Sequence, residues 1–366
     1  MTRSASAALM PLDEARTLLI GLARSVAPDT VPLAEAVGCV SAGPVLSAGD
    51  HPAGPIALRD GYAVEAALLG GASPYAPVRL LPPVWVEAGE VLPAGTDAVL
   101  PPEGLDGRDA VADVFVREGV REAGGDLRAG DALLAAGERI APRHLLALAA
   151  CGVTDVAIRR PLVALVVTGG PAPDALSPFL AAAITRQGGT SAIIAVPDAP
   201  DAPDAIADAI RGAAADAVLV LGGTGFGRSD HSAAGLTRAG RLLAHGLALR
   251  PGETAAIGEV GGRPVLLVPG APEAALAVFL ALGRPLLAAL SDIAPPGGAR
   301  TVLSRKIASG IGLSEIVYLR RGPGGVVPLG GVDLPLRRLV EADAALLVPP
   351  EREGYPEGTE VEVWDL

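Results

Sequence analysis

Apolar runs alternate with helical segments between Arg160 and Leu290, and this rhythm constrains the fold more than any other feature of the sequence. Continuous apolar runs predict buried strands at 162–167, 191–196, 217–221 and 264–268. Helices are predicted at 175–187, 203–215 and 271–290. Because strands that alternate with helices form parallel sheets covered on both faces, we expect a three-layer α/β domain with a parallel-rich sheet.

The flanking segments have other patterns. Amphipathic spacing predicts helices at 11–23 and 142–151, and a further helix and strand at 31–45. Short apolar runs broken by proline and glycine predict small β-rich units at 78–120 and beyond 294, the latter with strands at 315–320, 344–348 and 360–364. We therefore expect an α/β multidomain protein with four parts: an N-terminal helical and β arm (1–50 and 122–160), an inserted β-rich domain (51–121), the α/β domain (161–293) and a C-terminal β domain (294–366).

Composition excludes several classes of protein. The chain has 366 residues, 50% of them hydrophobic and 19% charged, so it is neither one small domain nor a disordered chain. A net charge of −12 argues against binding to nucleic acid or to acidic membranes. The apolar stretch 274–290 contains Gly283, Arg284 and Pro285, so we expect no transmembrane helix and a cytoplasmic protein. Cys39 and Cys151 are expected to be core thiols.

Three loops follow predicted parallel strands, at 168–171, 222–230 and 269–272. Ligands of open α/β sheets bind beyond the carboxyl ends of the strands. The second loop has four glycines among six residues, so its backbone N–H groups can wrap an anion, and Arg228 adds positive charge. A tight turn from strand to helix explains such a loop equally well, but three loops at consecutive strand ends favour a binding site.

Well-known signatures are absent from the sequence. The glycine-rich loop is not GxGxxG, and Lys306, the single lysine, lies far from a phosphate-binding loop. The chain has no Gly-x-Ser-x-Gly elbow, and its four histidines lack the spacing of metal ligands. His231 beside Asp230 fits either proton transfer or the start of a helix. The acidic residues between 198 and 208 are interpreted as a solvated helix entry.

Several segments occur in an order that is specific as a set: 31–38 (VPLAEAVG), 59–64 (RDGYAV), 92–99 (LPAGTDAV) with Glu103, 166–169 (VVTG), 222–230, 245–252 (HGLALRPG), 268–272 (VPGAP) and 354–363. Together they resemble the bacterial molybdopterin molybdenumtransferase family, the insertase of molybdenum-cofactor biosynthesis. The resemblance spans nearly the whole chain, and the four expected parts are similar to that family's domains.

The resemblance implies that adenylylated molybdopterin and molybdate meet in a cleft, that the metal is inserted into the dithiolene, and that AMP is released with the help of Mg²⁺. It implies catalytic roles for Asp60, Glu103 and Asp230, with Asp60 and Asp230 binding the metal ion. It further implies a homodimer in which Asp60 enters the cleft from a neighbouring domain or subunit, and a molybdoenzyme or another cofactor-biosynthesis protein as partner. The implied cofactor-binding residues are Thr168, Gly169, Gly222, Gly223, Thr224, Gly225, Gly227, Arg228, Arg250, Pro269 and Gly270.

The sequence also departs from the family's pattern. Arg59 replaces a methionine, Asp174 is the nearest acidic residue where the family has an acidic pair, and Glu253 replaces a lysine and so reverses the charge. Polar residues are replaced at 55–57, at Gly225 and at Ala271. Two alternatives to an active insertase therefore remain: a paralogue that carries molybdopterin or finished cofactor without transferring metal, and a scaffold that binds another small anion.

Overall fold

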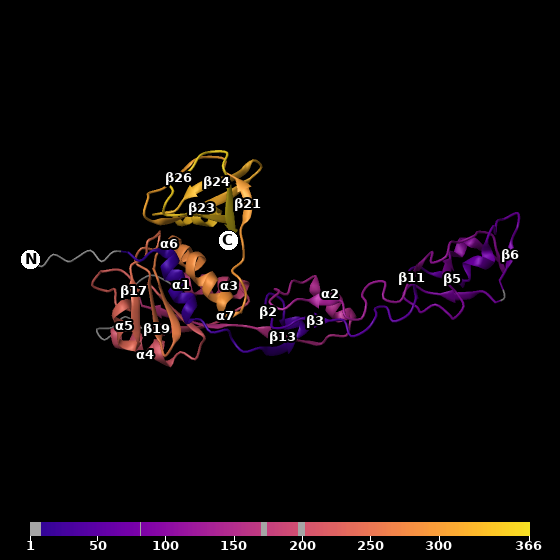
Figure 1. Cartoon of the computed structure of the whole chain (residues 1–366), viewed down its shortest axis with the longest axis horizontal. Helices are drawn as coiled ribbons and strands as arrows, with labels where there is room; N and C mark the ends of the chain where they lie inside the picture. The colour runs from indigo at the N-terminus through magenta and orange to yellow at the C-terminus, as the bar shows by residue number, and fades with distance from the viewer. Residues whose placement is uncertain (1–8, 81, 170–173, 197–201) are drawn as a thin grey trace, which may run out of the picture. The chain divides into compact units, whose positions relative to one another are not determined.

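The structure is a computed structural model that describes residues 9–80, 82–169, 174–196 and 202–366. The chain divides into two compact units (Figure 1). The first, called here the large unit, contains residues 1–29, 38–40 and 158–366, and the second, the small unit, contains residues 30–37 and 41–157. Each is described by itself.

A six-stranded sheet organises the large unit, in the order β15-β14-β16-β20-β19-β17. The first four strands are parallel, with Val166 of β14 paired to Ile194 of β15 and to Val220 of β16, while β19 and β17 run antiparallel at one edge. The predicted α/β fold with parallel strands is therefore confirmed. The strands are β14 (Leu162–Thr168), β15 (Thr190–Val196), β16 (Ala217–Leu221), β17 (Arg241–His245), β19 (Ala256–Val260) and β20 (Arg263–Val268).

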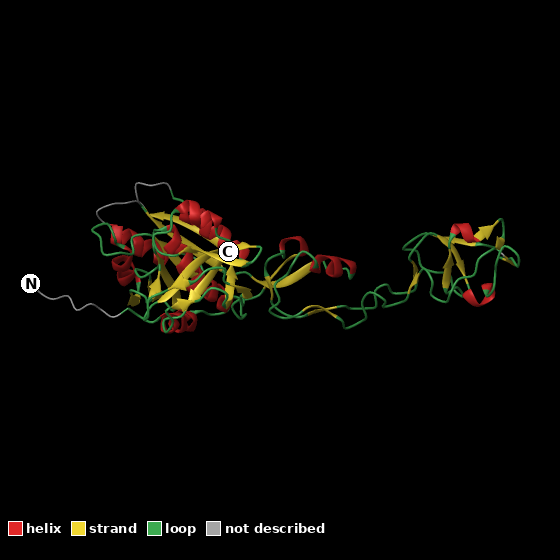
Figure 2. Cartoon of the chain, turned by 90° about the horizontal axis from the view of Figure 1, so that it is seen from above, coloured by secondary structure: helices red, strands yellow, loops and turns green. Residues whose placement is uncertain are grey.

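Helices cover both faces of this sheet (Figure 2). Alternate residues of β14 point to opposite faces, so Leu165 packs with α1, α3, α6 and α7, whereas Val166 packs with α4 and α5. Burial on both faces explains why these strands are continuous apolar runs. The helices are α1 (Leu12–Leu22), α3 (Leu176–Arg186), α4 (Ala202–Gly212), α5 (Ser232–Ala239), α6 (Pro272–Val278) and α7 (Arg284–Leu290).

The segment predicted as one helix at 271–290 is helical but is interrupted by a π turn, Phe279–Gly283, between α6 and α7. Pro285 has no N–H to donate to the Ala281 carbonyl, which explains the interruption. Arg16 of α1 donates its Nε to that carbonyl instead, at 3.3 Å. The segment 272–290 is long and apolar enough to cross a membrane, but 83% of its most hydropathic window is buried in the protein, as in a core helix.

The C-terminal part of the large unit is built from strands, as predicted. Its main sheet has the order β18-β23-β25-β27-β21, with β24 paired to β23, and β22 pairs with β26. Leu319, Leu346 and Val363 belong to its apolar core. The elements are β18 (Leu249–Arg250), β21 (Ala299–Val302), β22 (Ile307–Ala308), β23 (Ser314–Gly322), β24 (Gly325–Gly330), α8 (Leu336–Glu341), β25 (Ala344–Val348), β26 (Gly354–Tyr355) and β27 (Glu360–Asp365).

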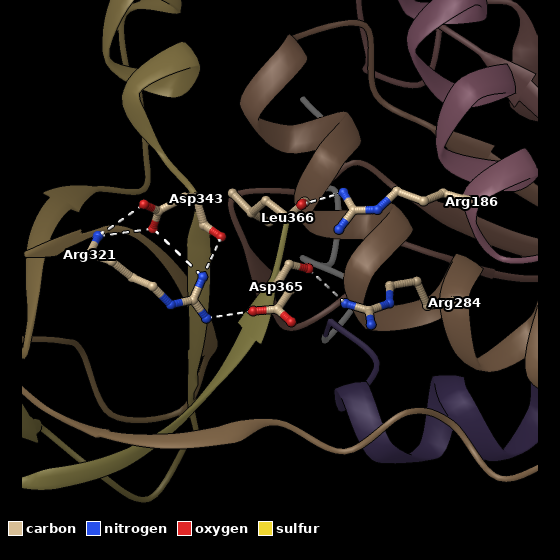
Figure 3. A network of polar contacts seen from close by, with 6 residues as sticks. All are labelled: Arg186, Arg284, Arg321, Asp343, Asp365 and Leu366. Atoms are coloured by element: carbon tan, nitrogen blue, oxygen red, sulfur yellow. Dashed lines mark hydrogen bonds and ion pairs between the residues drawn. The ribbon is translucent and has the colours of Figure 1, made fainter. Parts of the chain in front are cut away.

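Polar contacts tie the last strand, β27, to helices of the α/β layer (Figure 3). Arg284 of α7 donates to the Asp365 carbonyl at 3.2 Å, and Arg186 of α3 donates to Leu366 O. Arg321 pairs with the Asp365 carboxylate, and its backbone N–H donates to Asp343 at 2.9 Å. The C-terminal strands are thereby fixed against α3 and α7.

The small unit consists of short strands. Its sheets have the orders β7-β5-β8 and β6-β10-β9, and the pairs β4–β11 and β3–β12 are separate. Two apolar clusters lie within 57–120. The elements there and at its borders are β1 (Asp29–Pro32), β2 (Val40–Ser41), β3 (Val45–Leu46), β4 (Ile56–Ala57), β5 (Gly61–Val64), β6 (Val78–Arg79), β7 (Val84–Val86), β8 (Ala98–Leu100), β9 (Leu105–Asp106), β10 (Asp109–Ala110), β11 (Val120–Arg121), β12 (Ala132–Leu134), α2 (His144–Ala150) and β13 (Asp155–Arg159), with 3₁₀ turns at Leu33–Glu35, Ala66–Leu69 and Pro102–Gly104.

The prediction of a second helix at 31–45 is wrong. The segment contains a single 3₁₀ turn, Leu33–Glu35, followed by the two-residue strands β2 and β3. Pro32 has extended backbone, and Gly38 has a φ of +86°, so both ends of the intervening stretch lie outside the helical region. Cys39 is buried, as expected of a core thiol, while Cys151 is half-buried.

Candidate functional site

The order of the parallel strands reverses between β14 and β16. From β14 the chain passes through α3 to β15 on one side, and then through α4 to β16 on the other side. The two helices lie on opposite faces of the sheet, which opens a crevice at the carboxyl ends of β14 and β16. Thr168 ends β14 there, and its hydroxyl donates to the carbonyl of Leu221, the last residue of β16, at 2.8 Å.

Two glycines turn the chain at the end of β16. Gly222 and Gly223 have φ values of +84° and +59°, in the left-handed region that favours glycine. A Cβ at Gly222 would lie 3.1 Å from the Thr168 hydroxyl oxygen, and one at Gly223 would lie 3.0 Å from that of Ser232. The crevice therefore needs bare backbone at these positions for both conformation and space.

Asp230 organises the rest of the glycine-rich loop. Its Oδ2 accepts a hydrogen bond from the Gly227 N–H at 2.7 Å. A Cβ on Gly225 or Gly227 would approach the same oxygen to 2.7 or 2.8 Å. The loop consequently wraps around the Asp230 carboxylate, and the glycines leave the room it occupies.

The start of the loop is held by the end of β17 and by the turn that precedes β19. Thr224 is 3% exposed, and its hydroxyl lies 2.9 Å from that of Thr254. The Nε2 of His245, at the end of β17, lies 2.9 Å from the Thr224 carbonyl. Because a carbonyl oxygen accepts, this imidazole carries its hydrogen on Nε2.

A cleft of about 370 Å³ lies beside the glycine-rich loop. The loops after β16 and β20 line it together with residues 251–254 and with Val332 and Asp333 of the C-terminal part. The structure thus brings Gly223, Thr224, Gly225, Asp230, Pro269 and Gly270 of the predicted site together. The full lining is Gly223, Thr224, Gly225, Asp230, Pro251, Gly252, Glu253, Thr254, Pro269, Gly270, Ala271, Glu273, Ala274, Val332 and Asp333.

Other residues of the predicted site lie next to the cleft. Thr168 and Gly169 line a small hollow with Ser229 and His231, on the α4 side of the loop. His231 stands at the N-cap of α5 without a capping hydrogen bond from its side chain. Gly222 precedes the lining residue Gly223. Positions 170–173 of the first loop lie outside the described residues, as do Asp198 and Asp201 of the acidic stretch.

The charged side chains that line the cleft are all acidic. They are Asp230, Glu253, Glu273 and Asp333, and no lysine or arginine is among the described lining residues. In the part of the chain that the structure describes, no three histidine, cysteine, aspartate or glutamate side chains converge as a preformed metal site does. An anionic ligand therefore meets backbone N–H groups, hydroxyls and carboxylates, and its own charge has to be offset by a cation.

The two arginines expected to supply positive charge do not line the cleft. Arg228 is exposed in the glycine-rich loop. Arg250 lies with its Nε 3.7 Å from Glu253 Oε1, and Glu253 Oε2 also accepts from the Gly252 N–H at 3.0 Å. The carboxylate that reverses the charge at 253 thus offsets the neighbouring guanidinium.

In the small unit, Asp60 and Glu103 lie at the same end of one strand pair. Asp60 precedes β5 and Glu103 follows β8, and the antiparallel register pairs Tyr62 with Leu100. A Cβ at Gly61 would come within 2.4 Å of the Leu100 carbonyl oxygen, so glycine is required beside Asp60. Both carboxylates are exposed, and Asp60 Oδ1 accepts from the Ala88 N–H at 2.9 Å.

Two of the unusual residues have structural partners. Arg59 pairs with Glu118 at 2.9 Å and donates to the Val99 carbonyl at 2.8 Å, so it braces the small unit. Hydrogen bonds from the Phe115 N–H and from Arg59 lower the pKa of Glu118. Asp174 accepts from the Ser177 N–H at 3.0 Å and from the Ser177 hydroxyl, and so caps the start of α3.

Five lining residues were missed by sequence reasoning. Thr254, Glu273 and Ala274 lie just beyond motifs that were noticed, and the position of Glu273 in the first turn after Pro272 is a usable signal. Val332 and Asp333 follow β24, in a segment without any motif. They reach the cleft through packing of the C-terminal strands on α6, where Tyr318 and Ala275 share one core.

Comparisons with known proteins agree with this architecture. Three family descriptions match the chain: the MoeA N-terminal region (domain I and II) over residues 10–152, a probable molybdopterin binding domain over 116–289, and the MoeA C-terminal region (domain IV) over 335–366. Among curated relatives, molybdopterin molybdenumtransferase 2 of Mycobacterium tuberculosis is 28% identical, covering 97% of this chain and 99% of the relative. Molybdopterin molybdenumtransferase of Synechococcus elongatus is also 28% identical, covering 93% and 95%.

Solved structures show the same fold. A molybdopterin biosynthesis MoeA protein from Pyrococcus horikoshii superposes with a TM-score of 0.78 at 23% identity, covering 98% of this chain and all of the other. A second structure of that description superposes with a TM-score of 0.75 at 27% identity, covering 97% and 98%. The glycine-lined crevice lies within the match to the molybdopterin-binding domain, and the matches follow one another along the chain in the family's own order. The chain belongs to the MoeA family of molybdenum-cofactor biosynthesis proteins.

Proposed function

We propose that this protein inserts molybdenum into molybdopterin, with adenylylated molybdopterin and molybdate as substrates and with AMP and molybdenum cofactor as products. One observation carries the proposal: the cleft at the strand reversal is built on glycines whose Cβ atoms would collide with its walls. Its volume of about 370 Å³ lies in the range of small-ligand sites. The names of the relatives, molybdopterin molybdenumtransferases, support the same reaction.

The donors of the cleft suit an anionic ligand that brings its own cation. Exposed N–H groups of a glycine-rich turn bind phosphate or oxyanion oxygens. The hydroxyls of Thr224 and Thr254 add neutral donors beside them. The carboxylates disfavour a bare anion, so the proposal requires that phosphate charge be neutralised when the ligand binds.

Magnesium fits this donor set. Mg²⁺ in proteins is commonly held by one or two carboxylates together with substrate phosphates and waters, rather than by a complete protein cage. Asp230 supplies one such carboxylate at the cleft, and Asp60 of the small unit supplies the second in this proposal. The bound ion would neutralise phosphate charge and stabilise AMP as a leaving group.

The chain's own residues then have separate tasks. Gly222 to Gly227, with Pro269 and Gly270, bind and orient the ligand by backbone contacts, and Thr168 holds the ends of β14 and β16 together. Asp230 keeps the loop in its wrapped conformation and positions the cation. Glu103, at the same end of the β5–β8 pair as Asp60, is the third proposed catalytic carboxylate. The proposal includes a cytoplasmic homodimer in which Asp60 and the cleft belong to one site.

The test is AMP release from adenylylated molybdopterin with molybdate and Mg²⁺. We expect release by the purified protein and a loss of at least about 100-fold in Asp60→Asn, because a metal ligand is removed. Asp106→Asn, which removes an exposed carboxylate from a neighbouring hairpin of the small unit, is the matched control and keeps the wild-type rate.

The acidic cleft favours one alternative function. Without a basic side chain among its described lining residues, the protein would hold molybdopterin or finished cofactor as a carrier and transfer no metal. Pterin that stays bound to the protein without any AMP release in the same assay would establish the carrier and contradict the insertase. Equal rates for Asp60→Asn and wild type would refute the assigned role of Asp60.

A further inference from the structure

Phe226 is an exposed aromatic ring in the middle of the glycine-rich loop. Its exposed fraction is 84%, and it stands between Gly225 and Gly227. The tight approach to Asp230 requires small residues on either side of it. Since a phenyl ring in water gains no burial, the fold of the loop does not account for this residue.

The ring rests on His245. The two ring centroids are 5.0 Å apart and the planes are tilted by 31°, so the rings are in contact at a distance typical of aromatic pairs. The imidazole is itself fixed, because its Nε2 donates to the Thr224 carbonyl at 2.9 Å. His245 thereby sets the orientation of Phe226, and the ring keeps most of its surface open to solvent.

Phe226 directly follows two residues that line the cleft, Thr224 and Gly225. None of the described lining residues is aromatic, so a planar ligand finds no other aromatic side chain there. The polar and acidic lining suits phosphates with their cation but offers a flat heteroaromatic ring little contact area.

We propose that Phe226, supported by His245, is a stacking platform for a flat heteroaromatic ring of the ligand in this cleft. This inference rests on the proposed function, whose substrate carries two such rings, the pterin and the adenine. Both have the same stacking chemistry, and the experiment distinguishes them. His245 is a positioning residue, because it acts on the ligand through Phe226.

The first experiment measures dissociation constants of the full-length protein by calorimetry, with metal-free molybdopterin and, separately, AMP in the presence of Mg²⁺. We expect Phe226→Leu to weaken binding of one probe about 5- to 30-fold, as loss of one stacked ring does, and Phe226→Trp to restore it. Phe179→Leu is the matched control, since Phe179 is a half-exposed phenylalanine of the large unit that lines a different groove. It keeps wild-type affinity for both probes.

The second experiment separates the two roles of His245. His245→Gln keeps a donor for the Thr224 carbonyl and removes the ring under Phe226, whereas His245→Phe keeps a ring and removes the donor. We expect each to weaken the probe that Phe226→Leu weakens, and neither to weaken it further in the Phe226→Leu background. That non-additivity is not expected of a purely structural histidine.

The binding results show which ring of the ligand stacks on Phe226. Weakened molybdopterin binding alone places the pterin on Phe226, and weakened AMP binding alone places the adenine there. Unchanged affinities in Phe226→Leu, or an equal loss in Phe179→Leu, would overturn the platform while leaving the proposed function intact. Wild-type protein that binds neither probe would overturn the proposed function and the platform together.

Discussion

The hydroxyl of Tyr318 donates a hydrogen bond to the backbone carbonyl of Glu273, and this contact joins the C-terminal strands to the first turn of α6. Tyr318 belongs to β23 and is fully buried, whereas the side chain of Glu273 lines the cleft. The wall of the cleft at α6 is therefore held by a residue from the C-terminal part. The same hydrogen bond gives the first prediction.

Burial raises the pKa of Tyr318 far above its usual value of about 10, and the Glu273 charge raises it further. The folded protein thus keeps this proton where the unfolded chain loses it, so folding stability is complete below pH 10 and falls as the pH rises above it. We expect native wild type and Tyr318→Phe to give the same absorbance titration between pH 8 and 11. After unfolding in denaturant, the wild type should titrate one additional tyrosine. A difference of one tyrosine between the native proteins would contradict the assigned burial.

Gly223→Ala should damage both stability and binding. Its left-handed backbone costs alanine about 1 kcal/mol, and the new Cβ presses on the Ser232 hydroxyl oxygen at 3.0 Å. Gly261→Ala is the matched control, because Gly261 has nearly the same φ, +61°, and open space around it. We expect both variants to lose stability in urea unfolding, Gly223→Ala more because of the contact with Ser232, and molybdopterin binding to weaken only for Gly223→Ala. Equal molybdopterin affinities in the two variants would show that the ligand does not bind at the crevice beside Gly223.

Reversing the charge of Glu253 should strengthen anion binding. Glu253→Lys removes a carboxylate from the cleft and adds a cation, and charges several ångströms apart near a protein surface interact by about 2 kcal/mol. After screening by salt, we expect molybdate to bind about tenfold more tightly in titration calorimetry at low ionic strength. Glu357→Lys makes the same change of net charge at an exposed position and serves as control. Comparable gains in both variants would show that only overall charge matters.

The cap of α3 should depend on pH. Desolvation raises the pKa of Asp174, but hydrogen bonds from the Ser177 hydroxyl and from the N–H groups of Ser177 and Leu176 outweigh it and lower the pKa. Its stabilising effect is therefore present above about pH 4, the unfolded value, and is lost as the pH falls through the lower folded value. We expect Asp174→Ala to cost about 1 kcal/mol at pH 7 and less at pH 3.

Asp174→Asn provides the control for this prediction. An asparagine keeps a capping oxygen but does not titrate, so its difference from wild type should be small at pH 7 and should change sign or vanish at pH 3. A cost of Asp174→Ala that stays constant from pH 7 to pH 3 would mean that the carboxylate charge plays no part in the cap.

Periodicity predicted the central strands well because they are buried on both faces. β14 and β16 are uninterrupted apolar runs in the sequence. Because ligands of open α/β sheets bind beyond the carboxyl ends of the strands, these runs also located the glycine-rich loop. The antiparallel strands β17 and β19 were missed, since charged residues such as Arg241 and Glu259 break their apolar pattern. The prediction of a helix at 31–45 was wrong because the spacing of apolar residues does not reveal the positive φ at Gly38.

The site was predictable only as far as it is local in sequence. The turn glycines and Asp230 lie in one loop, so their grouping follows from the motif alone. The contribution of Asp333 depends on how the C-terminal strands pack on α6, a contact between segments about sixty residues apart that no local pattern encodes.

The large unit is interrupted in sequence by the small one, and this order has a consequence for synthesis on the ribosome. The buried residues Leu12, Ala15 and Leu19 of α1 pack with strands and helices made far later, down to Ala345 of β25. The small unit, in contrast, is completed by residue 157. Domains generally fold as they emerge from the ribosome. The apolar face of α1 therefore has no packing partner while the small unit folds. Nascent chains halted near residue 200 should therefore resist proteolysis between 41 and 157 and be cleaved within α1.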